Sequence, residues 1–326
     1  MTTPIDTLPT LQELEAASAL VHAAMPATPQ YRWPLLEART GVETWVKHEN
    51  HTPVGAFKVR GGITYFDWLA AQVPRVPGVV TATRGNHGQS VALAAARHGI
   101  PAVVVVPHGN SREKNAAMRA QGVELVEEGD DFQAAAEAAD RIARERGWYR
   151  LPSFHRDLVA GVGSYALELF TAVPDLDVVY VPIGLGSGVC GVLAAREALG
   201  LRTEVVGVVS THAPAYALSL ARGAPVSHSV TTVLADGMAC RTPVPEALAM
   251  MTGRLARVVQ VTDGQVADAM RAFFTDTHNV AEGAGAAALA ALLAERKQVA
   301  GRRAAVILCG GNVDADVFAR VLRGEA

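Results

Sequence analysis

Cysteine and lysine are both scarce in this chain of 326 residues. The three cysteines, Cys190, Cys240 and Cys309, form no CxxC pair, so the sequence predicts neither a zinc site nor a disulfide framework. Free cysteines are typical of a reducing compartment, and we therefore expect a cytoplasmic protein. Only four lysines are present, which narrows the candidates for any chemistry that needs an amine.

The chain also lacks a strong excess of charge of either sign. Its 29 Lys and Arg residues against 32 Asp and Glu residues give a net charge of -3, so no nucleic acid or anionic membrane is expected as a partner. The most apolar segment, VVYVPIGLGSGVCGVLAA, is interrupted by Pro182 and several glycines, which favours a buried strand, loop and helix over a membrane span. The first twenty residues have no basic region followed by an apolar one, so no signal peptide is predicted.

Short apolar runs alternate with amphipathic segments, the first of which follows a capping box formed by Thr10 and Glu13. Runs of Val and Ile without polar alternation indicate strands covered on both faces, hence an α/β fold with parallel sheets and helices on both sides. The length fits two open parallel-sheet domains: a large discontinuous one over residues 1–71 and 152–326, and a small one over 72–151. The predicted strands lie in VETWVKHE, GVVTAT, AVVVVP, VELVEEG, DVVYVPIG, EVVGVVS, ARVVQVT and AAVILCGG.

Glycine-rich segments follow several of these strands, namely ATRGNHG, PIGLGSG and LCGGN. Ligands of open parallel sheets bind outside the carboxyl ends of the strands, so we predict one site in the cleft between the two domains. Gly186, Gly188 and Gly191 fit the dinucleotide fingerprint G-x-G-x-x-G, but the acidic residue that would hold a ribose is absent after EVVGVVS. A nucleotide-binding dehydrogenase is therefore a minor alternative. Two interpretations of this glycine loop remain open: a phosphate cradle at the start of the following helix, or a tight turn that binds no ligand.

Lys58, in HTPVGAFKVRGG, is the lysine set in a glycine-punctuated loop beside an aromatic residue. Pyridoxal 5′-phosphate needs both a lysine amine and a loop of N–H donors for its phosphate. Partial removal from water would lower the pKa of the amine toward that of a usable nucleophile and base. The lysine and the glycine loop together predict pyridoxal 5′-phosphate as the cofactor.

Six segments, in order along nearly the whole chain, resemble the fold-type-II pyridoxal-phosphate enzymes of the tryptophan synthase β-like superfamily. Among these the closest resemblance is to the serine/threonine dehydratases. The resemblance implies an ammonia-lyase that eliminates the hydroxyl of threonine or serine and yields a 2-oxo acid and ammonia. The six segments are KHENHTPVGAFKVRGG, ATRGNHGQSVALAA, IGLGSGVCG, LADGMA, EGAGAAAL and LCGGNVD.

The same resemblance assigns site residues. Lys58 is implied to form the Schiff base and act as the catalytic base, with Phe57 packed on the pyridine ring. Cys309 is implied to face the pyridine nitrogen, where a neutral thiol would leave the nitrogen unprotonated and favour elimination over transamination. The other implied residues are Asn86 at the phenolic oxygen; Gly184, Leu185, Gly186, Ser187 and Gly188 as the phosphate cup; Gly237 and Glu282 lining the site; and Thr83, Arg84, Gly85, Asn86 and His87 at the substrate carboxylate.

Two departures from the family pattern concern cations and regulation. Many relatives bind a cation through carboxylates after the strand that corresponds to VVGVVS, but the matching VVSTHAPAYAL has no Asp or Glu. Hard cations need oxygen ligands, so no metal is expected there. The chain ends soon after LCGGNVD, from which we expect no regulatory domain and a catabolic role.

Arg84 is the strongest departure, because the family usually has Ser or Ala at that position. A guanidinium cannot exchange a proton at neutral pH, which disfavours racemisation. Arg84 either pairs with an acidic side chain on a neighbouring loop, or points into the pocket toward a second carboxylate or polar group of the substrate.

The sequence leaves several activities open beside the leading one. These are a dehydratase of a larger or acidic 3-hydroxy amino acid, a racemase, a β-replacement synthase and a non-catalytic protein that binds pyridoxal phosphate. The expected partner is a small amino-acid substrate, and a homodimer is compatible with the sequence.

Overall fold

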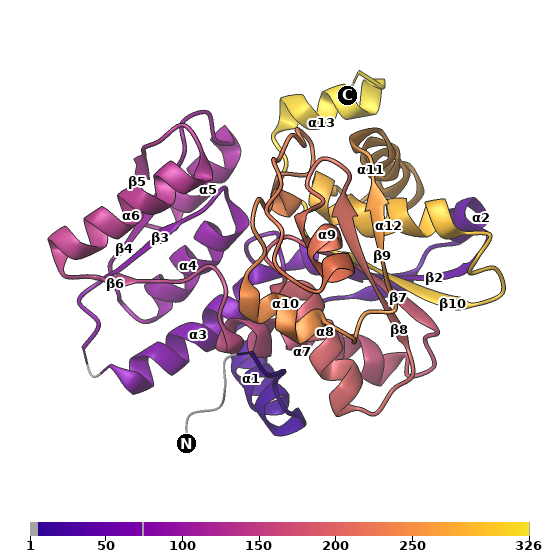
Figure 1. The fold of residues 1–326 in the computed structure, drawn as a ribbon, viewed down its shortest axis with the longest axis horizontal. Helices are drawn as coiled ribbons and strands as arrows, with labels where there is room; N and C mark the ends of the chain where they lie inside the picture. Colours follow the sequence, from indigo (N-terminus) through magenta and orange to yellow (C-terminus); the bar gives the residue numbers. More distant parts are fainter. Residues whose placement is uncertain (1–5, 74, 326) are drawn as a thin grey trace.

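The computed structural model describes residues 6–73 and 75–325 (Figure 1). Residues 1–5, 74 and 326 lie outside the described residues, and with them parts of the predicted domains and of the N-terminal segment. The strands are β1 (Gln30–Arg32), β2 (Glu43–His48), β3 (Val79–Ala82), β4 (Ala102–Val106), β5 (Glu124–Glu127), β6 (Tyr149–Arg150), β7 (Val178–Pro182), β8 (Glu204–Ser210), β9 (Arg257–Val261) and β10 (Arg303–Leu308).

The helices connect these strands and cover the two sheets that they form. They are α1 (Leu11–Ala24), α2 (Pro34–Thr40), η1 (Glu49–His51), α3 (Lys58–Gln72), α4 (Asn86–Arg97), α5 (Arg112–Ala120), α6 (Phe132–Arg146), α7 (Arg156–Ala172), α8 (Ser187–Ala198), α9 (Ala215–Arg222), η2 (Asp236–Met238), α10 (Pro245–Met251), α11 (Asp263–Thr277), α12 (Gly283–Glu295) and α13 (Ala315–Arg323).

The predicted α/β fold with two parallel sheets is confirmed. One sheet has the strand order β1-β2-β10-β7-β8-β9 and the other the order β5-β4-β3-β6. All eight predicted strands are present, and every pairing is parallel except that of β1 with β2. The sequence missed β1 and β6, since strands of three and two residues are too short to give a periodic pattern.

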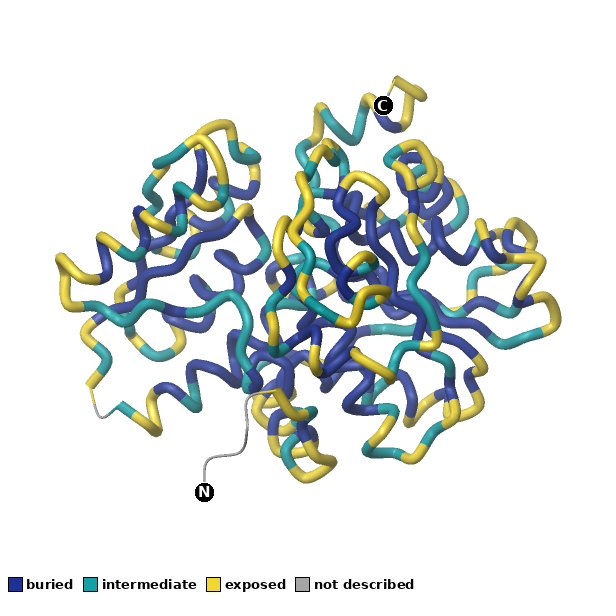
Figure 2. The backbone as a smooth tube through the Cα atoms, viewed as in Figure 1, coloured by how far each residue is buried: buried dark blue, intermediate teal, exposed yellow. Residues whose placement is uncertain are grey.

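The two sheets form two layered lobes that lie side by side, the four-stranded one with α4, α5 and α6 at the left of Figure 1. Helix α6 packs on β3 and β4, and α12 packs on β7, β8, β9 and β10. The inner strands of both sheets are mostly buried, as the non-alternating Val and Ile runs predicted, whereas the edge strands β5 and β9 have at most one buried residue each (Figure 2). The four-stranded sheet is built from residues 79–150; the domain boundaries at 71/72 and 151/152 stay a prediction.

Helix α1 begins with the predicted capping box. The Thr10 hydroxyl accepts a hydrogen bond from the backbone N–H of Glu13, and the Glu13 carboxylate accepts one from the backbone N–H of Thr10. Arg156 of α7 donates to both oxygens of the same carboxylate, at 2.6 and 2.7 Å, and these bonds lower the pKa of Glu13 to about 2. The cap therefore also ties α1 to α7. In the described ranges, no helix is both long and apolar enough to cross a membrane.

A buried ionic network lies behind the N-terminal half of α3. Arg60 is fully buried and donates to Glu49 at 2.7 Å and to Glu168 at 2.6 Å. Lys47, also fully buried, donates to Glu168 at 2.5 Å and to the carbonyl of Thr28 at 2.8 Å. Two cations and two carboxylates compensate one another, so burial does not leave an unpaired charge. The network ties α3 to β2, η1 and α7, and its Arg60 lies two residues after Lys58 in the chain.

The first prediction concerns acid stability. Burial alone would raise the pKa of Glu168, but the Arg60 and Lys47 partners outweigh it and lower the pKa to about 2. Because this value lies below the unfolded value near 4.5, Glu168 contributes about 3 kcal/mol of stability above pH 4.5, which is lost as the pH falls toward 2.

Glu168→Gln should therefore lower the free energy of unfolding at neutral pH by roughly 3–5 kcal/mol and flatten the decline of the melting temperature between pH 4.5 and 2. Melting curves over this pH range are the measurement, with the exposed Glu145 changed to Gln as the control. Equal curves for the two variants would contradict the assignment.

Candidate active site

Two cavities that share residues lie between the two sheets, at the carboxyl ends of strands. The Arg84 cavity, of about 100 Å³, contains the loop that joins β3 to α4. The Cys309 cavity, of about 30 Å³, contains the loop that joins β7 to α8 and the residue after β10. Lys58, Asn86, Gly184, Leu185 and Gly237 line both. Thr83, Arg84, Gly85 and His87 line the first alone, and Phe57, Gly186, Ser187, Gly188, Glu282 and Cys309 line the second alone.

Every site residue named from the sequence therefore lines one of these two cavities. The predicted location in a cleft at strand ends agrees with this placement. The individual role of each residue stays a prediction.

Lys58 is the first residue of α3, with Phe57 as its N-cap, so the predicted loop position is wrong. Two of the glycines that suggested a loop, Gly61 and Gly62, lie inside the helix, where they allow close packing, whereas Gly55 lies in the turn before it with a φ of +69°. A Cβ atom on Gly61 would lie 2.7 Å from the carbonyl oxygen of Leu158 in α7. Glycine in a sequence signals a turn or a close approach alike, and only the packing distinguishes them.

The Lys58 amine has no hydrogen-bond or ion-pair partner among the described residues, and it lies 4.9 Å from the centre of the Phe57 ring. Burial lowers its pKa, although Cys309 and Glu282 act in the opposite sense. Its place at the positive end of the α3 dipole also disfavours the ammonium form. Lys58 is thus a desolvated amine without a counter-ion, whereas the buried Lys47 is paired.

Helices α8 and α4 both begin at the cavities without a side-chain cap. Helix α8 starts at Ser187 after Gly186, and α4 starts at Asn86 after Gly85. Gly186 has a φ of +104°, a conformation that other residues rarely adopt. The first N–H groups of a helix have no acceptor within the helix and attract anions. The site therefore offers two anion-binding helix starts, one in each cavity.

Cys309 directly follows β10, and its carbonyl accepts a hydrogen bond of 3.0 Å from the backbone N–H of Phe57. Burial raises the pKa of its thiol, and Glu282 raises it further. His87 is also buried, and burial and then Lys58 lower its pKa to about 3. The thiol and the imidazole are consequently neutral groups near pH 7. The Nε2 atom of His87 has no hydrogen-bond partner in the described part of the chain.

The sequence reasoning missed a second buried lysine, Lys114 of α5. Its amine lies 2.8 Å from the Asp236 carboxylate and 3.2 Å from the Glu282 carboxylate. Burial lowers the pKa of Lys114, but Glu282 and Asp236 raise it by more, so this lysine stays protonated. Burial raises the pKa of Glu282, which Lys114 opposes. Lys114 therefore joins the small sheet's α5 to two carboxylates from the other lobe.

Asn86 is oriented by two neighbours. Its amide nitrogen donates to Glu282 at 2.5 Å, and its amide oxygen accepts from Asn312 at 2.8 Å. Asp236 and Asn312 stand in LADGMA and LCGGNVD, so the motifs contained a signal for them. Lys114 had none, because a single lysine on an amphipathic helix resembles a solvated surface residue.

Reciprocal caps hold α5, and with it Lys114, against the other lobe. The Asp314 carboxylate, at the N-cap of α13, accepts from the backbone N–H groups of Arg112 and Glu113 at the start of α5. In return, the Glu113 carboxylate accepts from the backbone N–H of Ala315 at 2.8 Å. Each helix supplies the acidic group that the other helix start favours.

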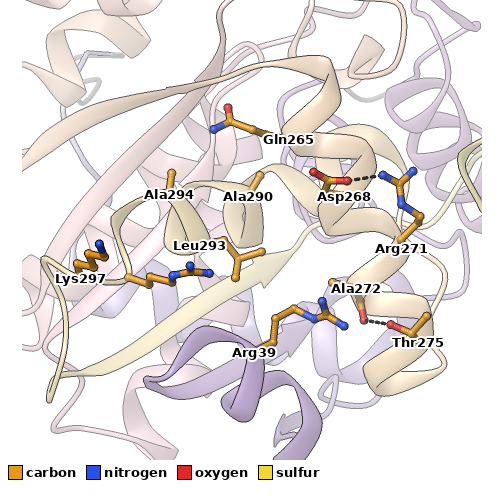
Figure 3. Close-up of a pocket in the computed structure, with 11 residues that line it drawn as sticks. Arg39, Gln265, Asp268, Arg271, Ala272, Thr275, Ala290, Leu293, Ala294 and Lys297 are labelled. Carbon is orange, nitrogen blue, oxygen red and sulfur yellow. Dashed lines mark hydrogen bonds and ion pairs between the residues drawn. The ribbon is translucent and has the colours of Figure 1, made fainter. Parts of the chain in front are cut away.

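Larger hollows lie elsewhere, and some of the charged side chains that line them are paired with each other or with neighbours. The cavity in Figure 3, of about 720 Å³, is lined by α11 and α12 and by Arg39 of α2. Arg39 pairs with Asp276, and Arg271 pairs with Asp268 (Figure 3). No group of three or more His, Cys, Asp or Glu side chains able to hold a metal ion occurs within residues 6–73 and 75–325.

Comparison with known proteins gives consistent results. The sequence model of the family described as "Pyridoxal-phosphate dependent enzyme" matches residues 22–310. The chain is 33% identical over 314 residues to the L-threonine ammonia-lyase of Thermotoga maritima, which covers 96% of this chain and 78% of that protein. It is 32% identical over 275 residues to the catabolic L-threonine dehydratase of Escherichia coli, covering 83% of each.

Solved structures share the fold over almost the whole chain. A threonine deaminase from T.th. has a TM-score of 0.87 at 29% identity, covering 94% of this chain and 99% of that one. Maize serine racemase has a TM-score of 0.89, and a pyridoxal 5′-phosphate-dependent aspartate racemase one of 0.88. Both racemases are 26% identical to this chain and cover 97% of it and 98% of their own chains.

The second prediction concerns Lys114. Lys114→Met should lower the free energy of unfolding by roughly 3–5 kcal/mol, because it leaves the Asp236 and Glu282 carboxylates without their cation. Adding Glu282→Gln should restore part of the loss. Denaturant unfolding measures both, and Lys297→Met, at an exposed lysine, should change the value by no more than about 0.5 kcal/mol. A double variant no more stable than Lys114→Met would argue against this pairing.

Proposed function

Because the chain belongs to the family of pyridoxal-phosphate-dependent enzymes, we propose that it is an ammonia-lyase acting on a β-hydroxy-α-amino acid such as threonine or serine. The products are a 2-oxo acid and ammonia. The observation that carries the proposal is the unpaired, desolvated amine of Lys58 beside two uncapped helix starts. The names of the similar L-threonine ammonia-lyases support the reaction type.

The residues at the two cavities fit pyridoxal phosphate. The loop Gly184–Gly188, which leads into the uncapped α8, would hold the phosphate, and Lys58 would anchor the aldehyde. Phe57 would pack on the pyridine ring, with Cys309 toward its nitrogen and Asn86 toward its phenolic oxygen. When bound, the cofactor withdraws electrons from the substrate's Cα and so weakens the Cα–H bond.

The chain's own residues bind the substrate and move one proton. The N–H groups at the uncapped start of α4 would bind the substrate carboxylate. Lys58 Nζ would accept the proton from Cα, since burial lowers the pKa of this amine and leaves a larger fraction neutral. Cys309 would remain a neutral thiol, because burial raises its pKa. A neutral partner at the pyridine nitrogen favours loss of the β-hydroxyl over transamination.

Racemisation is the competing reaction, because racemases are among the similar structures. It requires a second acid–base group on the face of Cα opposite Lys58. Three side chains of the Arg84 cavity have pKa values far from neutrality: that of His87 is lowered to about 3, that of Lys114 is raised, and that of Cys240 is raised to about 11. These three side chains are therefore poorly suited to that role. Chiral analysis of unreacted serine would reveal a racemase by its other enantiomer.

Location and assembly are further parts of the proposal. The three cysteines are free and buried, which suits a reducing cytoplasm. We propose a homodimer of subunits that each have a small domain at 72–151. Sedimentation of the purified protein would measure the assembly, and a monomer would contradict it.

The third prediction concerns Lys58. Lys58→Ala should reduce formation of 2-oxo acid and ammonia by at least about 10³-fold, because the variant loses the base and the cofactor anchor. Lys297→Ala, at an exposed lysine, serves as the control and should retain activity.

A labelling experiment tests the same assignment without turnover. Borohydride reduction of the holoenzyme should attach the cofactor to the peptide that contains Lys58, as detected by mass spectrometry. Attachment at Lys47 or Lys114, or normal turnover by Lys58→Ala, would refute the role proposed for Lys58.

A further inference from the structure

Four charged side chains line the Arg84 cavity: Lys58, Arg84, Lys114 and Asp236. Lys114 and Asp236 neutralise each other at 2.8 Å, and burial shifts Lys58 toward its neutral form. The Arg84 guanidinium has no ion pair or hydrogen bond within residues 6–73 and 75–325. The alternative that Arg84 pairs with an acidic side chain of a neighbouring loop therefore has no support in the described structure. Arg84 is the uncompensated cation of this cavity.

Two arginines at the larger cavity differ in this respect. In the cavity of Figure 3, Arg39 has a bidentate contact with Asp276, and Arg271 contacts Asp268. The chain thus supplies carboxylates to Arg39 and Arg271, but neither to Arg296, which lines the same hollow, nor to Arg84 among the described residues. An arginine without an internal carboxylate at a ligand cavity is available for an external one, to which it can donate two parallel hydrogen bonds.

The backbone around Arg84 is held in place by burial and by a hydrogen bond. Arg84 follows β3, and its neighbours Thr83 and Gly85 are both buried. The Thr83 hydroxyl accepts a hydrogen bond of 2.9 Å from the backbone N–H of Gly85. The exposed Arg84 side chain therefore leaves a well-anchored turn at the start of α4. The Arg84 side chain lies beside the helix start that we assign to the substrate's α-carboxylate. The guanidinium is therefore available to bind a second anionic group.

We propose that the preferred substrate is a β-hydroxy amino acid with a second carboxylate on its β-carbon, and that Arg84 binds this carboxylate. The proposal rests on the proposed function, whose substrate class it narrows from threonine-like to acidic. The smallest acid of this class is the four-carbon 3-hydroxyaspartate. The methyl group of threonine would give the guanidinium no partner.

The reaction balances with this substrate. Lys58 Nζ takes the Cα proton, and the Cβ–O electron pair leaves with the hydroxyl as a Cα=Cβ bond forms. The hydroxyl departs as water with one proton, which balances the proton taken from Cα. The released enamine becomes an imine, which one water hydrolyses to ammonia and a four-carbon 2-oxo dicarboxylic acid. One water leaves and one is consumed, so no oxidant, reductant or further reactant is needed.

The fourth prediction compares substrates across variants. The wild type should have a higher kcat/KM for 3-hydroxyaspartate, supplied as its separate stereoisomers, than for threonine or serine. Arg84→Ala should lower kcat/KM for 3-hydroxyaspartate by roughly ten- to a hundredfold, as expected for a lost charge-assisted contact, and should lower the values for threonine and serine by clearly less. Arg84→Lys should recover part of the loss, since it restores the charge without the bidentate geometry.

Arg97→Ala is the matched control. Arg97 is an exposed arginine at the opposite end of the same helix α4 and lines neither cavity, so this variant should behave as the wild type with every substrate.

A binding measurement removes turnover from the test. Malate and 3-hydroxybutyrate differ by a carboxylate in place of a methyl group, and neither carries an amine that could react. Calorimetry with the holoenzyme should find tighter binding of malate, and Arg84→Ala should abolish the difference while Arg97→Ala keeps it.

The outcomes separate the two proposals. If no β-hydroxy amino acid yields 2-oxo acid and ammonia, the proposed function fails. If threonine and serine react but 3-hydroxyaspartate is not preferred, or Arg84→Ala weakens all three substrates equally, the function stands and the role of Arg84 is overturned. Equal binding of malate and 3-hydroxybutyrate by the wild type would overturn it as well.

Discussion

The site depends on keeping one lysine amine out of water without giving it a counter-ion. A buried ammonium normally requires a carboxylate partner, because an unpaired charge in the interior is costly. Lys58 has none in the described structure, and the cost appears as a lowered pKa. Its amine faces an aromatic ring at 4.9 Å instead. The surrounding structure must hold this amine in place by means other than an ion pair.

The other lysines show how the chain achieves this. Lys47 and Lys114 are buried as well, but each is paired with carboxylates. Lys47 belongs to the Arg60 network that fixes α3 just after Lys58, and Lys114 takes up the negative charge of Asp236 and Glu282. The second arrangement engages Glu282, a carboxylate that raises the pKa of the Lys58 amine and so favours its charged form. The buried ion pairs therefore help to keep the Lys58 amine unpaired.

Two uncapped helix starts complete this arrangement. The starts of α8 and α4 present N–H groups at the two cavities, where side-chain caps would have occupied them. Such starts attract anions through backbone N–H groups alone. Arg84, exposed at the edge of the Arg84 cavity, can then differentiate substrates by their far end while the helix start binds what all amino acids share.

The sequence by itself determined the fold class, the cofactor and the candidate side chains. Val and Ile runs without alternation predicted doubly covered strands, and eight strands lie where those runs are. The glycine loop and Lys58 predicted pyridoxal phosphate, because each has a local chemical meaning. Motif order extended this to residues such as Asn86, Glu282 and Cys309, which line the predicted site.

Only the tertiary structure decided which charges are compensated. Lys114 and Glu282 are 168 residues apart in the sequence (282 − 114), and Arg60 and Glu168 are 108 apart. No local pattern relates such residues, since their contact depends on how α5 docks on the other lobe and α3 packs on α7. Likewise, Gly61 signals a turn in the sequence but a close helix contact in the fold. Periodicity and motifs depend on residues that are close in the sequence. The pairing of charges, the removal of Lys58 from water and the unpaired guanidinium of Arg84 depend instead on which residues the fold brings into contact.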